Sequence, residues 1–149
     1  MLFPRQTLLI LSLLFPLLAV TSHAQTGNFN LEDWPQTQAS LKPIYVKAIM
    51  EQAGVHKVSF NKSAEFYLAE LDRFSAFAQE KNYRPYLKMS VAQNLATIAI
   101  VNCDWKNGVP PWEFARKYLG TTQLELLKPL YSDAITKLQN NCVYPVNSQ

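Results

Sequence analysis

The segment from Tyr86 to Cys103 constrains the fold more than any other part of this chain, because Lys88 is its only charged residue. Apolar side chains surround almost the whole cylinder that the segment would form as a helix: Val91, Ala92, Leu95, Ala96, Ile98, Ala99, Ile100 and Val101. A helix that is apolar on all sides has to be buried by other elements. The sequence therefore predicts a central helix over 86–103, with Pro85 at its first position.

Apolar residues at helical spacing predict two helices before the central one. The first is expected to be capped by Ser40 and ended by Gly54, with Pro43 in its first turn. Its buried stripe is expected to contain Leu41, Ile44, Tyr45, Ala48 and Ile49. The second is expected to begin at about Asn61 and to bury Ala64, Tyr67, Leu68, Leu71, Phe74 and Ala78.

Two more helices are expected after the central one. Pro110 and Pro111 start a short helix that Gly120 ends. The last helix is expected to open with a capping box, in which Thr122 and Glu125 satisfy two backbone donors.

The apolar face of the last helix continues across Pro129. It is expected to contain Leu127, Leu130, Tyr131, Ala134, Leu138 and Cys142. This continuity predicts a kinked helix, and two shorter helices that meet at Lys128 are the alternative. The expected fold is all-α, a compact bundle of about five helices.

The first residues are typical of a secretory signal peptide. Arg5 gives a positive start, and residues 7–20 are almost all apolar. Ser22-His23-Ala24 then has small residues at the two positions that a signal peptidase inspects, which predicts cleavage after Ala24. An uncleaved anchor is disfavoured because the apolar run is short for a membrane span. The expected organisation is a signal peptide at 1–24, a polar leader at 25–39 and a single helical domain at 40–149. We expect a periplasmic or secreted protein with no membrane span in its mature chain.

Both cysteines fall in the expected mature chain, so an oxidising compartment favours one disulfide between Cys103 and Cys142. The alternative is a reactive thiol, which would need a histidine or a basic pocket beside Cys103. The mature chain carries 13 basic and 11 acidic residues, with no basic run longer than Arg116-Lys117. This charge distribution gives no support to nucleic-acid binding.

The residues offer little for catalysis or metal binding. His56 is the one histidine of the mature chain, and its neighbours include no nucleophile and no metal-ligand spacing. A haem with Met50 or Met89 as the second ligand lacks its attachment motif. A hydrolase could use two of the carboxylates Glu65, Asp72, Asp104 and Glu113, but acids on helix faces usually solvate the surface. We expect no enzyme activity, no metal and no cofactor.

The loop after Cys103 is the best candidate for binding. Trp105, Lys106, Asn107 and Trp112 lie around a glycine turn and a proline pair, and aromatic side chains on a rigid loop favour a protein interface. The alternative is that the two tryptophans, and Trp112 in particular, fold back onto the end of the bundle. Arg84, with Tyr83 and Tyr86, is a second candidate patch.

The segment from Cys103 to Cys142 also carries a family likeness. It contains a Gly108-Val109 turn, a short helix that ends in Lys117-Tyr118-Leu119, and a last helix that closes on Cys142. In this it resembles the C-terminal half of small exported immunity proteins that neutralise type VI secretion effectors in the periplasm. The resemblance implies an all-helical fold, a disulfide, and inhibition of a toxin by a surface loop that plugs its active site.

Two functions are therefore expected from the sequence. The first is a non-enzymatic inhibitor or immunity protein that binds another protein in the envelope or outside the cell. The second is a carrier or chaperone for a small apolar ligand, with a cavity lined by Phe60, Phe66, Phe74 and Phe77. A packed core with Trp105 exposed favours the first function, and an empty apolar pocket favours the second.

Overall fold

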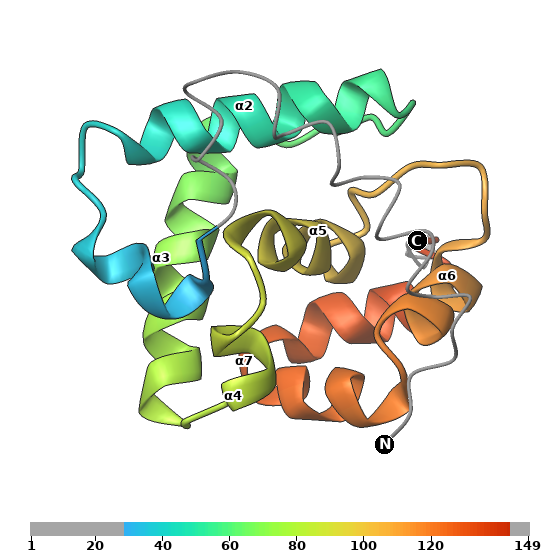
Figure 1. The fold of residues 1–149 in the computed structure, drawn as a ribbon. Coiled ribbons are helices and arrows are strands. Elements are labelled where there is room, and N and C mark those ends of the chain that lie inside the picture. Colours follow the sequence, from blue (N-terminus) through green and yellow to red (C-terminus); the bar gives the residue numbers. More distant parts are fainter. Residues whose placement is uncertain (1–28, 144–149) are drawn as a thin grey trace, which may run out of the picture.

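The computed structural model describes residues 29–143, and these form an all-α fold with one disulfide (Figure 1). The elements are η3 (Leu31–Gln36), α2 (Lys42–Val55), α3 (Ala64–Glu80), α4 (Arg84–Leu87), α5 (Val91–Val101), α6 (Pro111–Tyr118) and α7 (Thr121–Gln139). Within the described part, no helix is both long and apolar enough to cross a membrane. The expected signal peptide and its cleavage site lie outside the described residues.

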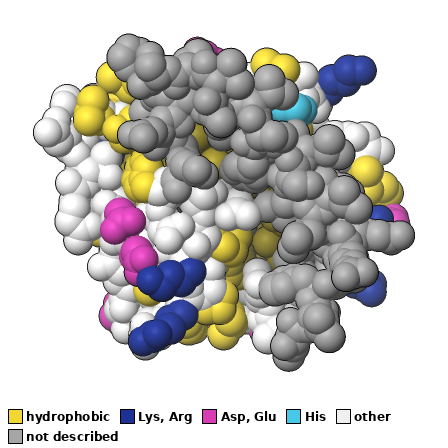
Figure 2. Space-filling view, viewed as in Figure 1, with side chains coloured by type: hydrophobic (Ala, Val, Ile, Leu, Met, Phe, Trp, Pro, Cys, Tyr) yellow, Lys and Arg dark blue, Asp and Glu magenta, His cyan; other side chains and the backbone are white. Residues whose placement is uncertain are grey.

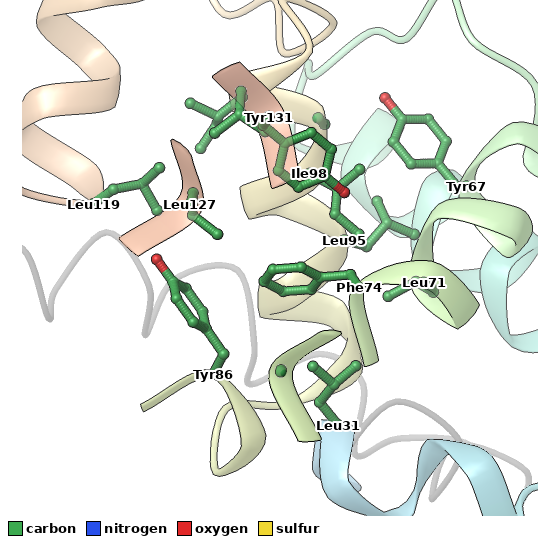
Figure 3. Packing of buried hydrophobic residues seen from close by; sticks show 14 of the residues in the cluster. Leu31, Tyr67, Leu71, Phe74, Tyr86, Leu95, Ile98, Leu119, Leu127 and Tyr131 are labelled. Carbon is green, nitrogen blue, oxygen red and sulfur yellow. The ribbon is translucent and has the colours of Figure 1, made fainter. Parts of the chain in front are cut away.

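Helix α5 is the centre of the domain, as the sequence predicts. Every residue of α5 except Gln93 is buried, and the helix contacts η3, α3, α6 and α7. In Figure 3 Leu95 and Ile98 lie among side chains from these neighbours, and the rings of Phe74 on α3 and Tyr131 on α7 are 6.2 Å apart between their centroids. The central position follows from the lack of a polar face.

The single helix expected over 86–103 is wrong, because the chain forms α4 and α5 with a break at residues 88–90. Ser90 and Gln93 form a capping box: the Gln93 N–H donates to Ser90 Oγ at 3.1 Å, and the Ser90 N–H donates to Gln93 Oε1 at 3.0 Å. The buried Asn94 amide then donates to three backbone carbonyls, those of Tyr86, Met89 and Ser90. Polar side chains thus satisfy backbone groups that a continuous helix would have paired.

Helix α2 also differs from its expected form. Ser40 does not cap it: Leu41 is the N-cap residue with no side-chain hydrogen bond, and the helix ends at Val55. Its buried residues are Val46, Ile49 and Ala53, whereas Ile44 is 58% exposed. Apolar residues lie all round this helix, so its contact with α3 selects the buried face and the periodicity does not.

Part of the expected polar leader belongs to the core. Leu31 and Trp34 in η3 are fully buried, and Trp34 Nε1 donates to Asp72 on α3 at 2.7 Å. The same carboxylate oxygen pairs with Lys42 at 2.8 Å, which holds η3 against α2 and α3. Folded structure therefore begins before residue 40.

Helix α3 buries the expected Tyr67, Leu71, Phe74 and Ala78, but it begins at Ala64 with Ser63 as its cap. Helix α6 begins at Pro111 as expected and ends just before Gly120, whose φ of 80° favours glycine.

Helix α7 is kinked, as its sequence predicts. Tyr131, two residues after Pro129, has non-helical dihedrals with φ −129° and ψ 31°, and the helix bends there. Pro129 removes one backbone donor from the preceding turn, which weakens the helix on the other side of the bend. The capping box of Thr122 and Glu125 is wrong: α7 begins at Thr121 with Gly120 as N-cap, and Glu125 pairs with Lys128 at 2.7 Å.

Candidate functional site

The candidate site is built on the chain between α5 and α6. The predicted disulfide is confirmed, and it joins Cys103 at the start of this connection to Cys142 just after α7, with their Cα atoms 5.7 Å apart. Both cysteines have positive φ, near 60°, so the disulfide holds two left-handed residues that would otherwise favour other conformations. The start of the connection is thereby fixed to the end of the last helix.

Asp104 fixes the next position. This side chain is 2% exposed, and it accepts hydrogen bonds from the Asn61 N–H at 2.7 Å, the Lys62 N–H at 3.0 Å and the Tyr67 hydroxyl at 2.5 Å. Its position at the start of α3 also suits a negative charge. Burial, together with the hydrogen bond to this carboxylate, raises the pKa of Tyr67 above its ordinary range. Asp104 therefore anchors the connection to α3.

Trp105 is a third anchor. Its half-buried ring stacks on Phe114 at 6.2 Å and meets the edge of Phe60 at 6.0 Å, as measured between ring centroids. Among the described residues the buried indole Nε1 has no hydrogen-bond partner. The ring thus packs onto the domain, so Trp105 is not the exposed side chain by which the sequence would have favoured a binding loop, and the exposed residues are those that follow it.

Residues 106–110, which we call the tip loop, are all exposed. The Asn107 side-chain oxygen accepts a hydrogen bond from the Val109 N–H at 3.2 Å, and Gly108 between them has a φ of 81°. The Lys106 carbonyl accepts a hydrogen bond from the Ser59 N–H at 3.4 Å. The loop therefore has its own turn and a backbone contact to the rest of the domain, and Lys106 and Asn107, two of the interface candidates, are exposed on it.

A groove of about 620 Å³ lies beside the tip loop, between α6 and α7. We call it the α6–α7 groove, and it is lined by Pro110, Trp112, Glu113, Arg116, Lys117, Gly120, Thr121 and Asn141. Trp112 is half-buried in this wall, and its backbone N–H donates to Asn141 Oδ1 at 3.1 Å. This groove was not predicted from the sequence, although the Arg116-Lys117 pair shortly before Gly120 was its visible signal.

The structure does not bring Arg84 to this site. Arg84 is exposed at the start of α4, which lies in Figure 1 at the opposite side of the domain from α6. The two tyrosines expected beside it pack inward. The ring centroids of Tyr83 and Phe77 are 5.5 Å apart, and the hydroxyl of the fully buried Tyr86 donates a hydrogen bond to the Gln123 carbonyl. Figure 2 shows acidic and basic side chains side by side near η3 and α4, where Lys88 and Glu32 pair at 2.7 Å. Arg84 is therefore one of the exposed charged residues around η3 and α4 and is not part of the candidate site.

The residues considered for chemistry have structural surroundings. His56 is the half-buried C-cap residue of α2, and its Nε2 is buried without a partner. Asp72 is bound by Trp34 and Lys42, while Glu65 is exposed in the first turn of α3 and Glu113 is exposed on α6. Over residues 29–143 there is no group of three or more His, Cys, Asp or Glu side chains that could hold a metal ion.

The four phenylalanines expected to line an apolar cavity pack against neighbouring rings. Phe74 is fully buried, and its ring centroid lies 5.2 Å from that of Tyr86. The ring centroids of Phe60 and Phe66 lie 5.5 and 5.2 Å from that of Tyr67. Phe77 contacts Tyr83, and none of the four lines the α6–α7 groove.

Comparison of the chain with protein-family models, with curated proteins and with solved structures finds no match. The candidate site therefore rests on its own geometry.

Proposed function

We propose that this protein is a non-enzymatic inhibitor that binds another protein outside the cytoplasm through the tip loop, as the immunity proteins that its C-terminal half resembles would do. One observation carries the proposal. Five consecutive residues, 106–110, are exposed, while the residues before them are fixed by a disulfide, a buried carboxylate and a stacked tryptophan.

Such a loop is suited to binding because it loses little conformational entropy when a partner binds. Ordering a flexible side chain at an interface costs about 0.5–1.5 kcal/mol, and ordering backbone costs more. Here Asp104, the Asn107 turn and the disulfide have already ordered the backbone in the free protein. Lys106 and the 43% exposed Val109 then offer a charge and an apolar contact to a partner.

A location in the periplasm or outside the cell is part of the proposal. The disulfide supports it, because such bonds form and persist in oxidising compartments. The phenylalanine cluster gives no support to the apolar carrier, since its rings contact one another and their tyrosine neighbours.

Affinity capture with matched variants tests this proposal. Immobilised wild-type protein, Lys106→Glu and Lys47→Glu are exposed to the exported fraction of the native host. Lys47 is an exposed residue of α2, so its variant changes the net charge equally and leaves the tip loop intact. We expect wild type and Lys47→Glu to retain the same protein and Lys106→Glu to lose it. Equal retention by all three would refute the tip loop as the interface.

A further inference from the structure

The α6–α7 groove combines an aromatic wall with two basic side chains that have no ion-pair partner in the part of the chain that the structure describes. Trp112 is half-buried in the wall, and Arg116 and Lys117 are exposed in the last turn of α6. Across the described residues neither cation forms an ion pair. Two adjacent cations beside an aromatic ring are therefore available to an external group.

The start of α7 increases the positive character of the same groove. Gly120 is the N-cap residue and has no side chain to accept a hydrogen bond from the first turn of α7. Thr121, also in the lining, is exposed and gives no capping bond. The amides at a helix start carry partial positive charge, so they add to the field of Arg116 and Lys117.

Glu113 is the one acidic side chain in the lining, and it lies one turn before Arg116 on α6. Its charge disfavours an anion beside its own carboxylate, so the part of a ligand that lies near Glu113 has to be neutral or cationic. Arg116 and Lys117 carry two positive charges against this one negative charge, so an acidic group is attracted to them.

We propose that the α6–α7 groove receives an acidic segment of the partner protein, whose carboxylates pair with Arg116 and Lys117 and whose apolar neighbour packs on Trp112. This inference rests on the proposed function and names the chemistry of the partner. Pro110 belongs to both the tip loop and the groove lining, so one partner can contact both surfaces.

Charge complementarity favours this occupant over the others. A second copy of the mature chain carries 13 basic and 11 acidic residues, so it also has a net positive charge and gives the groove no complementary charge overall. An apolar ligand would cover two cations without pairing them, which is costly because desolvated charge needs a partner. An acidic segment satisfies both cations and uses the aromatic wall.

Two blocked hexapeptides of equal length test the inference with the full-length mature protein. One contains Asp and Glu around a central Phe, and the other has Asn and Gln in their place. Titration at low salt is followed by ¹H–¹⁵N correlation spectra of labelled protein. We expect the acidic peptide to shift the amides of Trp112, Arg116, Lys117 and Thr121 saturably, and the neutral peptide to leave them in place.

Charge-matched variants make the test specific. We expect Arg116→Glu to weaken the acidic peptide at least about tenfold, which corresponds to about 1.4 kcal/mol. Lys47→Glu should bind as wild type does, and the dispersion of each spectrum shows that the variant is folded. Equal affinity for wild type and Arg116→Glu, or shifts that map elsewhere, would overturn the inference.

Two further outcomes separate the alternatives. If inorganic phosphate produces the same shifts and displaces the peptide at equal concentration, the groove is a small-anion site and the inference fails. In the affinity capture, loss of the partner by Lys106→Glu but not by Arg116→Glu leaves the tip-loop interface standing and refutes the acidic-segment inference. Loss by Arg116→Glu supports it, and retention by both variants refutes the proposed function itself.

Discussion

Replacement of Asp104 by alanine is the perturbation that tests the anchoring of the tip loop most severely. The carboxylate accepts three hydrogen bonds, from two backbone amides that precede α3 and from the Tyr67 hydroxyl, and it is almost completely buried. Asp104→Ala leaves these three donors without their acceptor. The variant also releases the start of the connection to α6 from the start of α3.

The expected loss of stability follows from these contacts. A hydrogen bond to a charged group contributes about 1.5–3 kcal/mol, and a buried donor left without its acceptor costs about 1–3 kcal/mol. With three such donors, we expect Asp104→Ala to lower the free energy of unfolding by about 3–5 kcal/mol, which is a large part of the roughly 5–15 kcal/mol typical of a domain. Asp104→Asn keeps one acceptor oxygen and should cost less.

Urea unfolding followed by circular dichroism measures this loss, and Asp133→Ala is the control because Asp133 is exposed on α7. The control should change the free energy of unfolding by less than about 0.5 kcal/mol. A double-mutant cycle with Tyr67→Phe should give a coupling of about 0.5–3 kcal/mol. If Asp104→Ala costs less than about 1 kcal/mol and is additive with Tyr67→Phe, the carboxylate is not an anchor and the reasoning fails.

The other predictions concern the caps, the disulfide and the buried tyrosines. Ser90→Ala should lower the free energy of unfolding, measured in urea, by about 1 kcal/mol, and Thr122→Ala should lower it much less, because of these two residues only Ser90 caps its helix. Equal losses would contradict the observed start of α7. Replacing both cysteines with serine should cost about 2–4 kcal/mol and speed amide exchange at residues 106–109, and unchanged exchange there would show that the disulfide does not order the tip loop. Burial raises the pKa of Tyr118 to about 12, and those of Tyr67, Tyr86 and Tyr131 are also raised above the ordinary value of 10.0. The raised pKa values of these tyrosines contribute fully to stability below pH 10. This contribution is lost as the pH rises from 10 through the folded pKa values, because the tyrosines of the unfolded chain ionise first. Chemical denaturation at pH 9 and 11 should show this fall and a smaller one in Tyr118→Phe, and an equal fall in that variant would argue against burial of this phenol.

The buried residues could be predicted wherever apolar side chains are clearly concentrated on a helix or on one of its faces. This holds for α5, which is apolar on almost all sides, and for α3. On α3 the regular spacing predicts a single buried face, and the structure buries its residues Tyr67, Leu71, Phe74 and Ala78. On α2 the bias is absent because Ile44 and Val46 point to different faces. There the contact with α3 determines which residues are buried, and local spacing does not contain that information.

Helix ends and long-range polar contacts were the least predictable features. Ser90 and Thr122 each precede a glutamine or glutamate at the spacing of a capping box, but only Ser90 adopts the extended dihedrals of a cap. The burial of Trp34 depends on Asp72, 38 residues later. In the candidate site, the sequence singled out Lys106 and Asn107 as interface candidates but not their exposure, and the stacking of Trp105 on Phe114 and the groove beside it depend on the packing of α6 on α7.

Site-specific photocrosslinking in the native host tests the central claim, that the tip loop is a protein interface, most directly. A photoreactive phenylalanine analogue replaces Val109, which is 43% exposed in the tip loop, or Val55, which is 70% exposed at the end of α2. Both positions are exposed apolar residues, so adducts from position 55 report nonspecific hydrophobic contacts. We predict one discrete protein adduct from position 109 and none of the same mass from position 55. No adduct from position 109, or the same adducts from both positions, would contradict the tip loop as the binding surface.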